Sequence, residues 1–184
     1  MHIAVPDAND ARLLEALARL TYDSARSHNP SWLPTLQDAT ETVQDALAPA
    51  TLCRVLLDGE KPIAWIAATP QEHGVWELHP LLVAPAHQRK GHGRTLVAEI
   101  ERLALAQGAR TMILSTADAV RATTLGGIDL FLNPLAALAG IDVTDAKAGH
   151  AYQFWVKVGY SLVGVLPDAE GPGIPSIQCA KLLA

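Results

Sequence analysis

The chain has 184 residues, of which 49% are hydrophobic, and its formal net charge is −5 at pH 7. This length suits one domain with a single core, residues 1–184. The apolar runs are too short for a membrane span of about 20 residues, and the N-terminus lacks a secretory-signal pattern, so we expect a soluble cytoplasmic protein. The acidic charge argues against nucleic-acid partners and suits cationic ones.

The first half of the chain alternates strand and helix patterns. A strand at 2–6 precedes a helix at 9–28, which Asn9 or Asp10 would cap. A weaker helix follows at 35–47, and residues 51–58 and 62–69 form a hairpin around a Gly-Glu-Lys turn. The strand at 74–85 contains Pro80, which predicts a β-bulge or an edge position there.

The second half continues the alternation. We expect a helix at 94–106, a strand at 109–118, a short helix at 151–158 and strands at 160–167 and 175–183. Residues 119–149 form an insertion longer than ordinary connections, which indicates a functional or interface segment. Alternating strands and helices predict an α/β fold with helices on the faces of a mixed sheet. Cys53 and Cys179 have no metal or disulfide spacing, so we expect buried, inert thiols.

The segment QRKGHGR, residues 88–94, gathers positive charge at a strand-to-helix junction. Gly91 and Gly93 permit backbone conformations that aim several N–H groups at one point, and the helix dipole acts at the same place. Phosphate anions favour nearby cations, which this turn supplies as Arg89, Lys90 and Arg94. The segment predicts a pyrophosphate site. It is neither a dinucleotide fingerprint, which needs a third glycine, nor a Walker loop.

The turn resembles the Gln/Arg-x-x-Gly-x-Gly/Ala signature of the GCN5-related N-acetyltransferases (GNAT). With WELHPLLV, TTLGGIDLF and YQFWVKVGYSLVGVLPDAEGPGIP, the stretch from about Val75 to Lys181 is similar to the aminoglycoside 6'-N-acetyltransferases. The resemblance implies a GNAT fold, with a mixed, mostly antiparallel sheet flanked by helices and a bulged strand at the acetyl-CoA site. It also implies acetyl transfer from acetyl-CoA to a primary amine, the 6'-amino group of an aminoglycoside, by direct attack in a ternary complex. No metal is implied, and related enzymes are dimers.

The same resemblance assigns the residues that bind the acetyl-CoA cosubstrate. The backbone of the bulged strand would meet the thioester, and the Leu81 N–H is our candidate donor to the developing oxyanion. Polar contacts from Thr123 or Thr124 are also implied. The expected cofactor set is Leu81, Leu82, Val83, Gln88, Arg89, Lys90, Gly91, His92, Gly93, Arg94, Thr123 and Trp155.

The amine acceptor is assigned to acidic and aromatic side chains. Glu77 and His79 share one face of a regular strand, and either could orient an ammonium group or remove its proton. We favour Glu77 over His79 as the anchor and base. The alternatives are an ordinary surface carboxylate for Glu77 and a structural role for His79. Asp118, at a strand end, matches an acidic residue beside the sugar in the family, and irregular segments add an acidic funnel. The expected acceptor set is Tyr22, Glu77, His79, Asp118 and Asp168, with Trp32 as a further flanking aromatic residue.

The chain departs from the family pattern at Trp155. Related enzymes have a tyrosine four residues before the glycine that is Gly159 here, and that tyrosine protonates the departing thiolate. An indole N–H donates a hydrogen bond but is not a practical acid. Tyr152, one helical turn earlier, is the expected substitute, and packing alone is the alternative for both residues.

The sequence also fits two other functions. The turn would be the same in an enzyme that acetylates a polyamine, a small metabolite or a protein lysine. The loss of the usual tyrosine also fits a non-catalytic module that only binds acyl-CoA.

Overall fold

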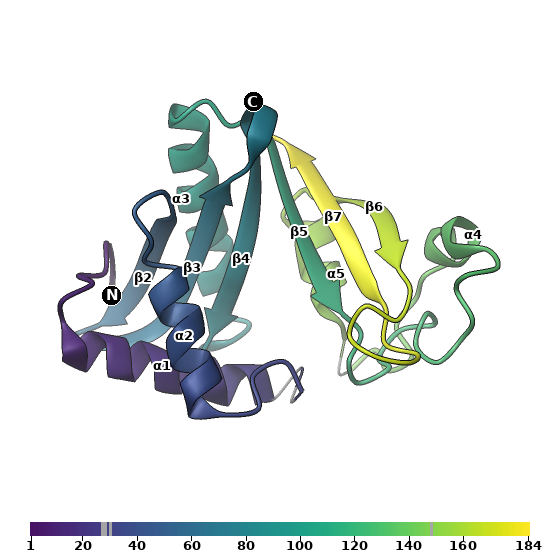
Figure 1. Cartoon of the computed structure of the whole chain (residues 1–184), viewed down its shortest axis with the longest axis horizontal. Helices are drawn as coiled ribbons and strands as arrows, with labels where there is room; N and C mark the ends of the chain where they lie inside the picture. The colour runs from purple at the N-terminus through teal and green to yellow at the C-terminus, as the bar shows by residue number, and fades with distance from the viewer. Residues whose placement is uncertain (27–28, 30, 148) are drawn as a thin grey trace. The chain divides into compact units, whose positions relative to one another are not determined.

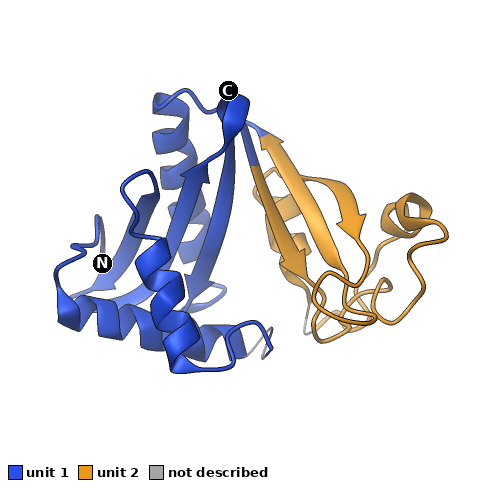
Figure 2. Cartoon of the chain, viewed as in Figure 1, with its two compact units in different colours: residues 1–112, 182–184 blue, residues 113–181 orange. Residues whose placement is uncertain are grey.

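The computed structural model describes residues 1–26, 29, 31–147 and 149–184. The chain divides into two compact units (Figure 2). Unit 1 comprises Met1–Met112 with Leu182–Ala184, and unit 2 comprises Ile113–Lys181. The expectation that residues 1–184 form one domain stays a prediction.

Unit 1 is an antiparallel sheet covered by helices on both faces (Figure 1). Its helices α1 and α2 pack against each other on one face, and α3 covers the other. Short 3₁₀ helices, η1 and η2, flank the last strand. The strands, in spatial order, are β1 (His2–Ala4), β2 (Leu52–Asp58), β3 (Lys61–Pro70) and β4 (Val75–Val83), and the helices are α1 (Ala11–Arg26), α2 (Leu36–Asp45), η1 (Glu72–Gly74), η2 (Pro85–His87) and α3 (His92–Ala106).

N-terminal caps stabilise helices α1 and α2, and the cap of α1 is one that the sequence predicts. Asp10 Oδ1 accepts the backbone N–H groups of Arg12 and Leu13 at 3.0 and 3.1 Å, so Asp10 is the cap of α1. Thr35 and Asp38 form a reciprocal capping box at the start of α2. The expected helix at 9–28 is confirmed as far as Arg26, because Ser27 and His28 lie outside the described residues.

The core of unit 1 is centred on β3, whose residues 62–68 are all buried. Trp65 packs among apolar side chains of α1, α2 and β2, and its indole N–H donates to Thr21 Oγ1 at 2.9 Å. This bond satisfies a polar group that burial would otherwise leave unpaired. Cys53 lies in the same cluster, and burial raises the pKa of its thiol to about 12. Burial likewise raises the pKa of the Cys179 thiol to about 11, so both thiols are buried and protonated, as predicted.

Unit 2 combines a small sheet with a largely irregular insertion. The strand order is β5 (Thr111–Ala117), β7 (Ser176–Leu182), β6 (Ser161–Leu166), and β6 pairs with β7 in antiparallel fashion. The insertion at 119–149 contains α4 (Pro134–Ala139) and an isolated bridge between Thr123 and Val143. Ala148 of the insertion lies outside the described residues. Helix α5 (Ala151–Lys157) then leads into β6.

The predicted elements are confirmed with small shifts at their ends. Helix α3 begins at His92, two residues before the expected start, because Gly91 already has the backbone conformation of its cap. The α/β class is confirmed. No helix within the described residues is long and apolar enough to span a membrane.

Candidate functional site

The turn at residues 88–94 joins the end of β4 to the start of α3. Arg89 and Gly91 both have left-handed backbone conformations, with φ of 59° and 88°. Gly91 caps the helix, and its carbonyl accepts the Thr95 N–H at 3.1 Å. The N–H groups of the first helical turn therefore point out of the start of α3, which is the arrangement that binds anions.

Side chains of the turn hold its shape and supply its charge. Gln88 Nε2 donates to the Val83 carbonyl at 3.1 Å, and Lys90 Nζ donates to the Ala86 carbonyl at 2.8 Å. The Lys90 ammonium thus stays over the turn, and Arg89 and Arg94 are exposed beside it. The predicted cofactor residues from Gln88 to Arg94 are brought together in one cationic turn.

The space in front of Gly91 is open. A Cβ atom built on Gly91 would meet no heavy atom within 4 Å, and the residue is exposed. His92, the next residue, is half-buried, and its ring centroid lies 6.2 Å from that of His87. A ligand can therefore approach the backbone at Gly91 closely.

The strand that precedes the turn has the predicted bulge. Ile66 pairs with Leu81 but Ala68 pairs with Leu78, so one residue of β3 faces two residues of β4. The irregularity lies at the His79–Pro80 peptide, which is cis. The expectation of a bulge at Pro80 is confirmed. Beyond the bulge, the predicted thioester residues Leu81, Leu82 and Val83 are half-buried.

Glu77 and His79 lie on one face of β4, as their spacing predicts. Both are exposed, whereas Trp76, which precedes Glu77, and Leu78, which lies between Glu77 and His79, are buried on the other face. The Trp32 ring packs edge-on against the His79 ring, with centroids 5.3 Å apart. The exposed Glu77 carboxylate thus lies two residues along β4 from His79, whose ring packs against Trp32.

Tyr22 belongs to the neighbouring helix α1. Its hydroxyl accepts a hydrogen bond from Arg26 Nη1 at 2.6 Å, and the same guanidinium lies 5.3 Å from its ring centroid. Tyr22 and Trp32 both pack against the small cluster of Ala25, Leu33 and Ala39. Arg26, which sequence reasoning did not select, therefore fixes the predicted acceptor residue Tyr22.

In unit 2, Asp118 organises the loop that follows β5. Its carboxylate is fully buried and accepts the backbone N–H groups of Ala122 and Thr123 at 2.6 and 3.1 Å. The Thr123 hydroxyl donates to the same carboxylate at 2.7 Å and accepts the Leu125 N–H. The hydrogen bonds of Asp118 and Thr123 described above all lie within the loop. A direct contact of Asp118 with the acceptor and one of Thr123 with the cofactor stay predictions.

Replacing Asp118 by asparagine should destabilise this loop. The amide would turn one acceptor into a donor that faces a backbone N–H, and we expect a loss of about 1–3 kcal/mol in the free energy of unfolding. Urea denaturation measures this loss. Asp168→Asn is the matched control, because exposed Asp168 accepts one backbone N–H, from Gly173, in a left-handed conformation that asparagine tolerates. Equal losses in the two variants would contradict this account of Asp118.

Helix α5 carries Trp155, at the position of the family's tyrosine, and Tyr152, its expected substitute as a proton donor. Tyr152 and Trp155 are buried. Burial and the Asp142 carboxylate raise the pKa of Tyr152 above its usual value, so its phenol is a weaker acid than that of an exposed tyrosine. Trp155 packs edge-on against Phe154 and Tyr160, with centroids at 4.9 and 5.3 Å. These contacts give Trp155 a packing role, and its assignment to the cofactor stays a prediction.

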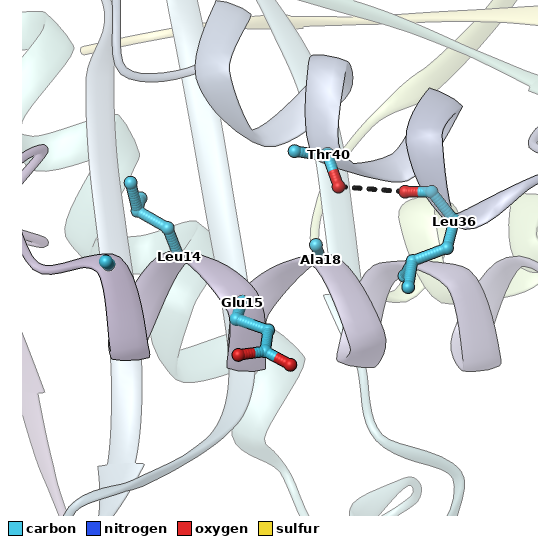
Figure 3. A pocket seen from close by; sticks show the side chains of 6 residues that line it. Leu14, Glu15, Ala18, Leu36 and Thr40 are labelled. Carbon is cyan, nitrogen blue, oxygen red and sulfur yellow. Dashed lines mark hydrogen bonds between the residues drawn. The ribbon is translucent and has the colours of Figure 1, made fainter.

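A separate cavity of about 260 Å³ lies between α1 and α2 (Figure 3). Its polar groups already have partners: the Thr40 hydroxyl donates to the Leu36 carbonyl at 2.9 Å, and Glu15 pairs with Arg19 at 2.9 Å. It includes none of the residues that the sequence selected. The lining residues are Ala11, Leu14, Glu15, Ala18, Leu36 and Thr40.

Comparison with known proteins shows the family. The model of the acetyltransferase (GNAT) family matches residues 14–127. The crystal structure of an aminoglycoside 6'-N-acetyltransferase complexed with coenzyme A superposes with a TM-score of 0.88 at 31% identity, covering 100% of this chain and 98% of that chain. The aminoglycoside 6'-N-acetyltransferase from Enterococcus faecium gives 0.85 at 31% identity, with the same coverage. A search of curated proteins found no match. The predicted GNAT fold is confirmed, and the chain belongs to the GNAT acetyltransferase family.

Proposed function

We propose that the protein transfers the acetyl group of acetyl-CoA to the 6'-amino group of an aminoglycoside, by direct attack in a ternary complex. The observation that carries this proposal is a bulged strand that presents an exposed carboxylate, Glu77, and ends in the cationic turn at 88–94. The similarity to two aminoglycoside 6'-N-acetyltransferases over the whole chain supports the choice of acceptor.

The turn is the proposed site of the diphosphate of acetyl-CoA. Backbone N–H groups at the start of α3 would bind its oxygens, and the exposed cations Arg89, Lys90 and Arg94 would balance its charge. A structurally similar enzyme was crystallised in complex with coenzyme A, which supports the proposal that this chain binds acetyl-CoA.

The chemistry follows from the neighbouring strand. Glu77 accepts a proton from the ammonium group, directly or through water, and the free amine nitrogen attacks the thioester carbonyl carbon. The Leu81 N–H donates to the oxyanion that forms. When the carbon–sulfur bond breaks, the thiolate of CoA leaves and takes a proton from the Tyr152 phenol. The new amide nitrogen then loses its extra proton through water to the tyrosinate, which restores the phenol. No metal is required by these steps.

Acidic residues in or near the insertion would attract the cationic acceptor before it binds. Exposed Asp168 is one of these, whereas we assign buried Asp118 an indirect role through its loop. Trp32 supplies aromatic surface against His79, and Tyr22 packs against the same small cluster as Trp32. A cationic aminosugar would be attracted to the Trp32 ring, whereas the Tyr22 ring already has the Arg26 guanidinium over it.

We also propose that two copies associate through the insertion. Phe131, Leu132 and Leu135 are 70%, 85% and 69% exposed, which is unusual for adjacent large apolar side chains. Light scattering coupled to gel filtration should give the mass of a dimer for the native chain and of a monomer for Leu132→Asp. Leu105→Asp on α3, also an exposed leucine, is the control that should remain dimeric.

The test of the proposed function is acetyl transfer over a panel of amines. We expect kanamycin-type aminoglycosides to be acetylated, with the modified nitrogen identified as the 6'-amine by NMR. Turnover of a polyamine or a peptide lysine but no aminoglycoside would contradict the acceptor. Tight binding of acetyl-CoA without turnover of any amine would instead support a non-catalytic acyl-CoA-binding module.

A further inference from the structure

A buried histidine joins the start of α5 to the end of β5, within unit 2. The His150 side chain is 6% exposed. Its Nδ1 atom accepts the backbone N–H of Tyr152 at 3.2 Å, and its Nε2 atom lies 3.1 Å from the Ala117 carbonyl oxygen. The Gln153 side chain accepts the backbone N–H of His150 in return, at 3.2 Å. The imidazole is therefore the N-cap of α5 and also a tie to the neighbouring strand.

These contacts fix the protonation state of the ring. The Ala117 carbonyl can only accept, so Nε2 must carry a proton, and the Tyr152 N–H can only donate, so Nδ1 must be free of one. The neutral Nε2–H tautomer alone satisfies both bonds. A second proton on Nδ1 would replace the acceptor by a donor and break the cap.

The charged and titratable groups near the His150 ring include the Asp118 carboxylate and the Tyr152 phenol. The Asp118 carboxylate lies 3.9 Å from Nε2 and would attract an imidazolium. The Tyr152 phenol ring packs at 5.6 Å between centroids and is itself within the influence of Asp142. Protonation of His150 would thus shift the ring toward Asp118 while it releases the start of α5.

We propose that neutral His150 is a positioning residue that holds α5, and with it Tyr152, in place, and that its protonation releases the helix start and slows acetyl transfer. The effect on transfer rests on the proposed function, because Tyr152 matters to the rate only if it protonates the leaving thiolate. Lowering the pH from 8 toward 5.5 tests this switch, because unperturbed imidazoles gain their second proton between about pH 5 and 8.

Two matched variants separate the two bonds of the ring. His150→Asn keeps an acceptor for the Tyr152 N–H but does not titrate, and His150→Gln keeps a donor that can reach Ala117 but loses the cap. Because the amine substrate also titrates, the informative quantity is the ratio of kcat for the native chain to kcat for His150→Asn at each pH. We expect that ratio to be constant near pH 8 and to fall about fivefold toward pH 5.5, the factor that one helix cap contributes. His150→Gln should lose about fivefold in kcat at pH 8, with little change in either KM.

A readout without substrate tests the switch itself. In ¹⁵N NMR spectra of the native chain at pH 8, we expect the Nε2–H tautomer of His150, and protection of the Tyr152 amide from hydrogen exchange should fall as the imidazole titrates. The Nδ1–H tautomer, or identical pH profiles of kcat in the native chain and His150→Asn, would overturn the proposal. If the NMR signature is present but no amine is acetylated, the proposed function fails and the helix switch stands.

Discussion

Gly91→Val should raise the dissociation constant of acetyl-CoA by about 100-fold, equivalent to about 2.7 kcal/mol. Gly91 has a φ of 88°, a conformation that β-branched residues rarely adopt, so the substitution deforms the cap of α3. Its side chain would also enter the open space in front of the turn, where we propose that the diphosphate binds. Isothermal titration calorimetry with acetyl-CoA measures the loss of affinity to which both effects contribute.

Gly59→Val is the matched control for backbone strain. Gly59 lies in the β2–β3 turn with a φ of 63°, and a Cβ atom there would also meet nothing within 4 Å. Both variants should lose similar stability, in the range of about 1–3 kcal/mol, but only Gly91→Val should lose affinity. An unchanged dissociation constant for Gly91→Val would remove the turn from the cofactor site.

Glu77→Gln should lower kcat/KM for an aminoglycoside by about 100-fold and leave the affinity for acetyl-CoA unchanged. The amide keeps the size of the side chain but neither binds an ammonium group strongly nor accepts its proton. Steady-state kinetics at saturating acetyl-CoA and calorimetry of the cofactor separate these two effects.

Glu72→Gln provides the control for net charge. Glu72 lies just before β4, and its carboxylate is highly exposed and 3.7 Å from His73 Nε2. The same loss of one negative charge should leave kcat/KM within about twofold, because exposed charges act weakly through solvent. Comparable losses in both variants would show that general electrostatic attraction, not a specific contact, accounts for the effect of Glu77.

Features encoded by short-range pattern could be predicted from the sequence. The shared face of Glu77 and His79 follows from the two-residue period of a strand, and the bulge follows from a proline that cannot donate to the ladder. The turn at 88–94 was predictable because its glycines and cations are adjacent in the chain. Its helix begins two residues early, since a left-handed glycine cap is a conformational feature that residue identity alone does not locate.

Features that depend on contacts across the fold could not be predicted. Asp118 is at a strand end, as expected, but only the path of the following loop turns its carboxylate inward to Thr123. His150 was missed because histidine is an uncommon cap, although the glutamine three residues later is the usual partner in a capping box. The acidic residues in or near the insertion show no periodic pattern, so their assignment to an acidic funnel depends on their charge and on the irregular segments in which they lie.

The Val83 carbonyl oxygen links three parts of unit 1. It accepts from the Gln88 amide at 3.1 Å and from the Ser24 hydroxyl at 3.5 Å, so the last residue of β4, the turn and helix α1 are tied at one atom. Under the proposed function, Leu81 meets the thioester and Gly91 the diphosphate, and Val83 lies between these two residues in the chain. The separation of those two groups in the donor is the length of its pantetheine arm. These hydrogen bonds would therefore fix the spacing between the two binding points. The enzyme would then favour acetyl-CoA over shorter thioesters that carry the same acetyl group.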